Sequence, residues 1–188
     1  SGINPKLEFN FSNNENIKQK INELNQLIDK QREMLINSAD SISVLTSLIY
    51  ECDSSRKKIN SRIFASSDPN NRSKEGNNEL DLPSMLSGVS KIENDINLIF
   101  NWLSLAKTAH PSSFDVDNSC EKLSNLQEKL KNTVGKYFVE LDPEESERII
   151  SSIKGEVILI SISQKFLDDI AVKTDECFQI MEKISLMQ

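Results

Sequence analysis

Apolar residues recur at alternating spacings of four and three positions along the first third of the chain. A repeat of about 3.5 residues keeps one face of a helix turned toward a neighbouring helix over its whole length. The pattern therefore predicts a helix over residues 14–64 that requires long helical partners. Its repeat positions, eleven of them apolar, are Ile17, Ile21, Leu24, Ile28, Gln31, Leu35, Ser38, Ile42, Leu45, Ile49, Cys52, Arg56, Ile59 and Ile63.

Three more helices are expected further along the chain. Asp142 followed by Pro143 is a strong start signal, because aspartate caps a helix and proline fits its first turn. The polar stretch 65–83 contains turn-forming residues and predicts a flexible loop. Residues 1–13 are expected to be a tag remnant followed by a flexible segment. The apolar repeats place the helices at residues 14–64, 84–108, 117–140 and 143–187.

Two of these helices are apolar over a wide arc, which is typical of a helix buried against more than one neighbour. The second helix carries an additional apolar face with Leu98, Phe100, Trp102 and Leu105. The last helix carries two parallel stripes. One contains Ile150, Ile153, Val157, Ile160, Leu167, Ala171, Phe178 and Met181, and the other contains Leu159, Phe166, Ile170, Cys177, Ile180, Ile184 and Met187. Gly155 is the position at which this helix could break.

The pattern predicts an all-α fold, an elongated antiparallel helical bundle with coiled-coil-like packing and a single domain over residues 14–188. Two long helices, 14–64 and 143–187, would hold a shorter hairpin of helices 84–108 and 117–140. Such a hairpin covers only half of the long helices, so the other half should expose an apolar seam for a helical partner or a second copy of the chain. The seam residues are Ile17, Ile21, Leu24, Leu27, Ile28, Leu35, Ile180, Ile184 and Met187.

Composition excludes several classes of function. Charged residues make up 27% of the 188 residues, and glycine and proline contribute five each, a balance that suits helices. The net charge of −7 disfavours a nucleic-acid partner. No apolar run approaches the ~20 residues needed to cross a bilayer, so we expect no integral membrane segment. The odd number of scattered cysteines indicates reduced thiols and a cytoplasmic protein, in association with the cytoskeleton or an organelle as a further alternative.

Candidate chemistry is sparse, and the chain is expected not to be an enzyme. His110 is the single histidine and has no neighbouring cysteine or histidine with which to bind zinc. The stretch from Asp115 to Ser119 begins like a calcium loop, but Cys120 and Leu126 replace the glycine and glutamate that such a loop requires. No glycine-rich phosphate loop is present. We expect no catalytic residue, cofactor or metal.

One concentrated basic face lies near the end of the first helix. It consists of Arg56, Lys57, Lys58 and Arg62. This face could contact an acidic partner. Cations close to the carboxyl end of a helix also complement the helix dipole, and this structural interpretation remains an alternative.

Residues 84–188 resemble a spectrin repeat, the three-helix unit of spectrin, plakin and nesprin-type cytoskeletal linkers. The resemblance rests on Trp102-Leu103 late in a first helix and on Leu141-Asp142-Pro143-Glu144-Glu145 before the last helix. It implies a spacer or docking role. We therefore expect a non-enzymatic scaffold or adaptor, a fragment of a larger cytoskeleton- or organelle-associated coiled-coil protein. The alternative is a syntaxin-like regulatory bundle in membrane trafficking or tethering.

Overall fold

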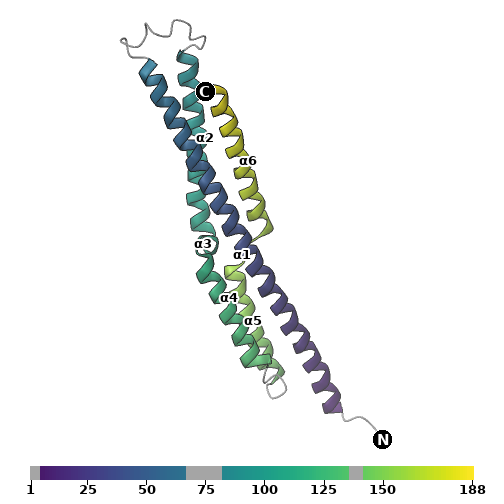
Figure 1. The fold of residues 1–188 in the computed structure, drawn as a ribbon. Helices are drawn as coiled ribbons and strands as arrows, with labels where there is room; N and C mark the ends of the chain where they lie inside the picture. The colour runs from purple at the N-terminus through teal and green to yellow at the C-terminus, as the bar shows by residue number, and fades with distance from the viewer. Residues whose placement is uncertain (1–4, 67–81, 136–141) are drawn as a thin grey trace. The chain divides into compact units, whose positions relative to one another are not determined.

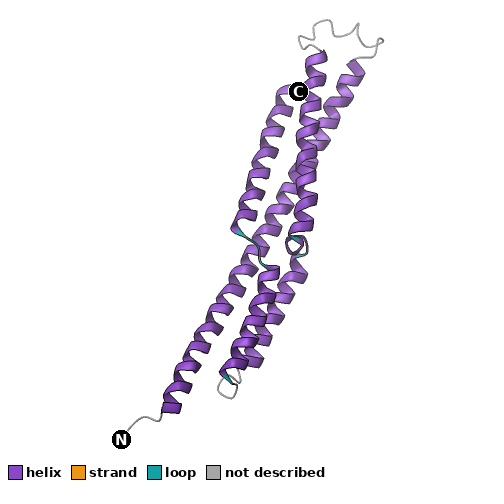
Figure 2. Ribbon diagram, turned by 180° about the vertical axis from the view of Figure 1, so that it is seen from behind, coloured by secondary structure: helices purple, strands orange, loops and turns teal. Residues whose placement is uncertain are grey.

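The computed structural model of the chain describes residues 5–66, 82–135 and 142–188, and these residues form helices joined by short connections, without a strand (Figure 2). The all-α helical bundle predicted from the sequence is confirmed. The elements in Figure 1 are α1 (Pro5–Ser66), α2 (Leu82–Ala109), α3 (Pro111–Phe114), α4 (Val116–Leu130), the π-helix η1 (Lys131–Gly135), α5 (Pro143–Ile160) and α6 (Gln164–Met187).

The helices group into two compact units. Unit 1 combines the described parts of residues 1–39 and 112–163, and unit 2 combines those of residues 40–111 and 164–188. Helix α1 contributes its first part to unit 1 and its second part to unit 2. The single domain over residues 14–188 stays a prediction.

Unit 1 is a three-helix bundle in which α4 runs antiparallel and α5 parallel to α1. Arg32 on α1 contacts Gln127 on α4 at 3.1 Å, and six residues later Ser38 contacts Ser113, earlier in the chain than Gln127. The Lys20 ammonium lies 2.6 Å from a Glu147 carboxylate oxygen on α5. Gln31 then meets the chain just after α5, so α1 and α5 advance together.

Unit 2 has the same up-down-up order with α1, α2 and α6. The rings of Tyr50 on α1 and Phe100 on α2 pack edge to face with centroids 5.2 Å apart. Arg56, which follows Tyr50 on α1, contacts Glu93, which precedes Phe100 on α2, so these helices are antiparallel. Helix α6 is antiparallel to α2 and parallel to α1. Helix α6 lies beside α2 in both views of the ribbon (Figures 1 and 2).

The predicted hairpin of the second and third helices is wrong. Helix α2 packs in unit 2 and α4 in unit 1, and each runs antiparallel to its own part of α1. Helix α2 ends at Ala109, and Pro111 opens α3, because a proline at the first helical position sacrifices no helical hydrogen bond.

The predicted long last helix is also wrong, because it breaks at residues 161–163 into α5 and α6. Ser161 adopts an extended backbone with φ −63° and ψ 142°, and its hydroxyl donates to the Val157 carbonyl at 2.9 Å. The freed backbone N–H of Ile162 donates to Gln31 Oε1 at 3.0 Å. Gly155, the break point suggested by the sequence, lies inside α5.

The break explains the two apolar stripes of the expected last helix. Helix α5 buries the first stripe through Ile150, Ile153 and Val157. Helix α6 buries the second stripe through Phe166, Ile170, Cys177, Ile180 and Ile184. The extended residues between the helices change the rotational phase, so each helix buries only one stripe.

The largest difference between a predicted and an observed helix end is at the start of α1. Helix α1 begins at Pro5, although residues 1–13 were expected to be flexible. Adding residues to an existing helix avoids the cost of nucleation, which lets α1 extend through an asparagine-rich stretch. Most of the expected loop 65–83, and residues 136–140 of the expected third helix, lie outside the described residues.

Candidate functional site: the groove between α2 and α6

The apolar seam that was predicted to be exposed is largely buried. In unit 1, α4 and α5 cover α1, so Ile17, Leu24, Ile28 and Leu35 are buried while Ile21 and Leu27 are half-buried. In unit 2, Ile180 and Ile184 of α6 are buried, and Met187 is half-buried. The prediction failed because it left the first helix with a single partner at this end. The seam is therefore a core surface.

Two polar positions of the α1 repeat contact the chain where other helices are interrupted. Gln31 accepts the N–H of Ile162 between α5 and α6, as described above. The buried Ser38 hydroxyl lies 3.1 Å from the Ser113 hydroxyl, which belongs to the short helix α3 between α2 and α4. These polar residues hydrogen-bond groups that a regular helix pair would leave without a polar partner.

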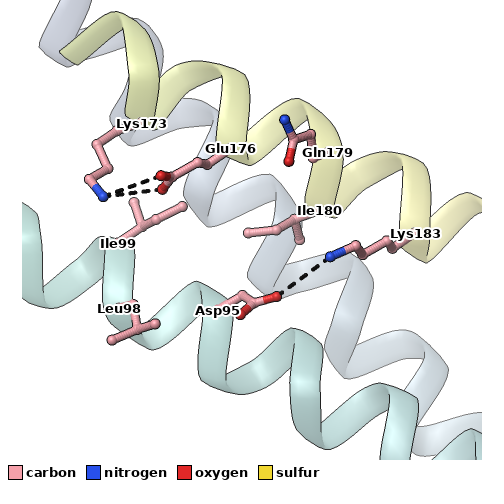
Figure 3. Close-up of a pocket in the computed structure, with 8 residues that line it drawn as sticks. All are labelled: Asp95, Leu98, Ile99, Lys173, Glu176, Gln179, Ile180 and Lys183. Atoms are coloured by element: carbon pink, nitrogen blue, oxygen red, sulfur yellow. Dashed lines mark hydrogen bonds and ion pairs between the residues drawn. The ribbon is translucent and has the colours of Figure 1, made fainter. Parts of the chain in front are cut away.

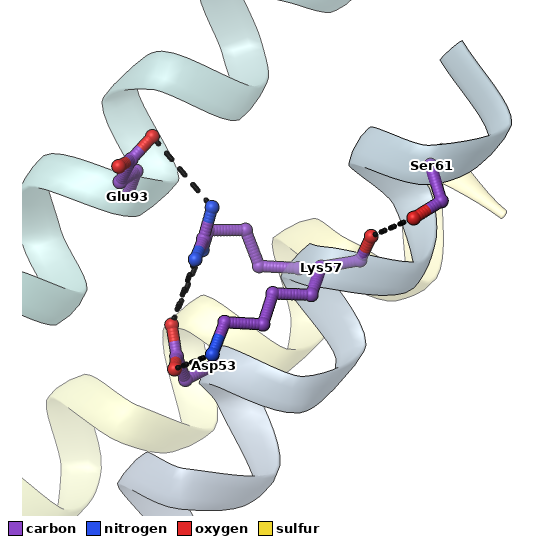
Figure 4. Close-up of polar contacts among 5 residues, drawn as sticks. Asp53, Lys57, Ser61 and Glu93 are labelled. Carbon is purple, nitrogen blue, oxygen red and sulfur yellow. Dashed lines mark hydrogen bonds and ion pairs between the residues drawn. The ribbon is translucent and has the colours of Figure 1, made fainter. Parts of the chain in front are cut away.

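The basic cluster is partly neutralised inside unit 2 (Figure 4). The Arg56 guanidinium lies 3.0 Å from an Asp53 carboxylate oxygen and 3.6 Å from Glu93 on α2. The Lys57 ammonium lies 3.2 Å from the other Asp53 oxygen. Lys58 and Arg62 are exposed. The structure thus assigns Arg56 and Lys57 internal partners, and contact with an acidic partner stays a prediction.

The pKa of Asp53 in this cluster lies below its usual value. Partial burial raises the pKa of Asp53, but hydrogen bonds from Arg56 and Lys57 outweigh it and hold the pKa below its usual value. Its charged form therefore stabilises the folded state. That contribution is complete above the unfolded-state pKa of about 3.9 and is lost as the pH falls through the lower folded-state value.

We expect Asp53→Asn to lower the free energy of unfolding by about 1 kcal/mol at pH 7. The difference from the unmodified protein should shrink as the pH falls below about 4, because the unmodified carboxyl group is then protonated as well. Urea unfolding followed by circular dichroism between pH 3 and pH 7 measures both quantities. A difference that stays constant over this range would show that the ion pairs of Asp53 do not stabilise the fold.

An open groove of about 280 Å³ lies between α2 and α6 in unit 2 (Figure 3). Its apolar centre is formed by the buried Ile99 and Ile180, with Leu98 at the α2 edge. Figure 3 shows Ile99 and Ile180 between the two helices, with another part of the chain passing behind them. The antiparallel pair thus presents an apolar strip between helix edges.

An ion pair lies near each end of the groove (Figure 3). Asp95 on α2 and Lys183 on α6 are 3.8 Å apart, and the Lys173 ammonium lies 3.2 Å from the carboxylate of Glu176 on α6. Each pair combines opposite charges, so the walls of the groove are close to electrically neutral. Apolar contact is therefore the main interaction that the groove offers.

The apolar strip continues along the outer surface of α2. Leu98 is 58% exposed and Leu105, one heptad later, is 70% exposed. Between them Trp102 is half-buried and stacks on Phe166 of α6 with ring centroids 6.1 Å apart. His110 stacks on the same ring at 3.9 Å. The aromatic contacts join α2 to α6, so the exposed Leu98 and Leu105 lie on a helix that is packed against its neighbour.

The sequence contained a signal for this site. The second apolar face of the expected helix 84–108 predicted burial against more than one neighbour, and α2 does contact both α1 and α6, but part of that face is not covered. In the structure Phe100 packs on Tyr50 and Trp102 packs on Phe166, whereas Leu98 and Leu105 remain exposed. The residues on α6 that complete the groove could not be assigned, because the break before Gln164 sets their phase.

Other kinds of site find little support in the described part of the chain. Within residues 5–66, 82–135 and 142–188, no group of three or more histidine, cysteine, aspartate or glutamate side chains is arranged to hold a metal ion. A search of the same residues finds no helix with the length and apolar character needed to span a membrane.

The fold defines this chain as an all-α helical-bundle protein with two compact units. No protein-family model, curated protein or solved structure matches it.

Proposed function

We propose that the protein is a non-enzymatic scaffold or adaptor that binds an amphipathic helix of another protein along the α2–α6 groove. The observation that supports this most directly is the pair of exposed leucines, Leu98 and Leu105, beside the apolar strip of Ile99 and Ile180. A surface of this kind suits a helix whose apolar residues recur at three-, four- and seven-residue spacings.

The charges of the chain indicate which kind of amphipathic helix the groove would bind. The ion pairs at the groove ends are internally balanced, so they favour polar rather than strongly charged flanks directly beside the apolar stripe. The whole chain carries a net charge of −7, which attracts a cationic partner over longer distances and repels another copy of itself. The proposed occupant is therefore an amphipathic helix with an apolar stripe and a net positive charge.

The assembly in which this binding occurs is proposed on the sequence alone. The resemblance of residues 84–188 to a spectrin repeat favours a fragment of a larger cytoskeleton- or organelle-associated linker in the cytoplasm. In the structure, each three-helix unit also includes a part of α1, so the bundles are not confined to residues 84–188.

A syntaxin-like regulatory bundle in trafficking or tethering is the second candidate. The up-down-up order of unit 2 favours it, because a three-helix bundle with a groove between two of its helices accommodates a fourth helix. Both candidates use the α2–α6 groove. They differ in the protein that supplies the helix, and identifying that protein would separate them.

A display library of amphipathic peptides about 15 residues long, roughly four helical turns, tests the shared binding site. Peptides selected on the unmodified protein should carry a net positive charge, with polar residues directly beside the apolar stripe and the basic residues further from it. We expect Leu98→Asp with Leu105→Asp to weaken their binding at least about tenfold, a loss of ~1.4 kcal/mol measured by fluorescence anisotropy.

Leu159→Asp is the matched control, because Leu159 is an 83% exposed leucine on α5 in unit 1. It should leave peptide affinity unchanged. Equal affinity for the unmodified protein and the double variant, with helix content retained in both, would contradict the groove. Sedimentation equilibrium adds a further outcome: dimers that dissociate in the double variant would make a second copy the occupant and overturn the proposed partner.

A further inference from the structure

Two of the three cysteines meet in the core of unit 2. Cys52 on α1 and Cys177 on α6 are free and fully buried, and Cys52 Sγ lies 3.5 Å from the backbone oxygen of Cys177. Because Cys52 contacts Cys177 and both are buried, their side chains belong to the same core layer between the parallel helices α1 and α6. Cys120, also free, lies on α4 in unit 1.

The two thiols differ in their readiness to ionise. A hydrogen bond with the Cys177 side chain lowers the pKa of Cys52, while burial and Glu51 oppose that effect. The same hydrogen bond, together with burial, raises the pKa of Cys177. Cys52 is therefore the thiol of this pair that more readily becomes the nucleophilic thiolate, with Cys177 beside it as the second thiol.

We propose that Cys52 and Cys177 form a redox-active dithiol that closes to an intramolecular disulfide between α1 and α6 on exposure to a peroxide. The Cys52 thiolate attacks one peroxide oxygen, the O–O bond breaks, and Cys52 becomes a sulfenic acid as hydroxide leaves and takes up a proton. Cys177 then gives up its proton and attacks the Cys52 sulfur, and the departing hydroxyl leaves as water. In total, two thiols and one hydrogen peroxide yield one disulfide and two waters.

Burial controls this reaction. Because both sulfurs are inaccessible in the closed bundle, peroxide reaches them only during local opening between α1 and α6 in unit 2. On reclosing, the packing returns the two sulfurs to the same layer and favours their bond over further oxidation. The disulfide then joins α1 to the helix that carries Glu176 and Ile180 of the groove.

The test uses the full chain with Cys120→Ser, so that only the buried pair can react. After treatment of the folded protein with hydrogen peroxide, titratable thiols should fall from two to none. The intact mass should fall by two hydrogen atoms, and the product should remain monomeric on a non-reducing gel. The urea midpoint should rise and return to its starting value after reduction, because a disulfide constrains the unfolded chain.

The matched control carries Cys120→Ser and Cys177→Ser, and it should show neither the mass loss nor the higher midpoint. Two outcomes would overturn the proposal. One is the retention of both thiols in the folded protein under conditions that oxidise the urea-unfolded protein. The other is a mass gain from added oxygen without a disulfide, which would show that the two sulfurs do not come into bonding geometry.

Discussion

Replacing Ile28 with aspartate should destabilise the protein by more than about 4 kcal/mol, enough to unfold unit 1. Ile28 is 0% exposed on the face of α1 that α4 and α5 cover. An aspartate there would place a carboxylate in the core, where the neighbouring repeat positions Leu24, Gln31 and Leu35 offer it no cationic partner. Thermal and urea unfolding monitored by circular dichroism would show reduced helix content or a much lower midpoint.

Ile36→Asp is the matched control on the same helix. Ile36 is 45% exposed, so an aspartate at this position remains hydrated and should change stability by no more than about 0.5 kcal/mol. The comparison separates a core seam from an exposed docking seam. If Ile28→Asp and Ile36→Asp had similarly small effects, the burial of the α1 seam would be contradicted.

Local sequence patterns predicted those features of the fold that depend on local chemistry. The 4-3 repeat of α1 marks the face that is buried, and Asp142 accepts the N–H of Glu144 at the start of α5 with Pro143 in the first turn. The ends of α2 lie within two residues of those expected. Periodicity and capping act over one or two helical turns, so one sequence suffices to detect them.

The partners of each helix were not predictable in the same way. Which part of α1 each of α2 and α4 contacts, and whether the chain breaks after Ile160, depends on residues far apart in sequence. Ser161-Ile162-Ser163 contains neither glycine nor proline, and the apolar pattern continues across it. The two stripes of residues 143–187 were the available indication of the break, because a single regular helix in a three-helix bundle needs only one.

The exposed part of the candidate site was not predictable for the same reason. The wide apolar arc of α2 was evident in the sequence, but which part of it is exposed depends on where α1 and α6 pack. Helix α6 occupies the side of Trp102 and α1 the side of Phe100, which leaves Leu98 and Leu105 at the surface. An excess of apolar residues beyond what the bundle itself buries is thus the structural basis of the proposed docking function.

The polar positions of the α1 repeat indicate how the bundle specifies its breaks. A uniformly apolar seam would pack against a continuous helix, whereas Gln31 provides a hydrogen-bond acceptor where α5 ends and Ser38 provides a hydroxyl opposite α3. A buried backbone N–H without an acceptor costs about 1–3 kcal/mol. Gln31 is therefore expected to stabilise the broken arrangement relative to a continuous last helix.

Gln31→Met tests this role, because methionine is similar in size to glutamine but cannot accept the Ile162 N–H in the same way. We expect a loss of about 1–3 kcal/mol in the free energy of unfolding. Hydrogen exchange should identify the cause, since the Ile162 amide loses its acceptor and should exchange faster than in the unmodified protein, while amides in the middle of α5 change less.

Gln19→Met is the matched control, because Gln19 is exposed on the same helix and hydrogen-bonds only the exposed Glu23 in the described contacts. It should change stability by no more than about 0.5 kcal/mol and leave Ile162 exchange unaltered. Stability retained in Gln31→Met with faster Ile162 exchange would mean that the break persists without this hydrogen bond. The break would then depend on the burial of Ile162 and Phe166 on either side of Ser163, and Gln31 would not be what specifies it.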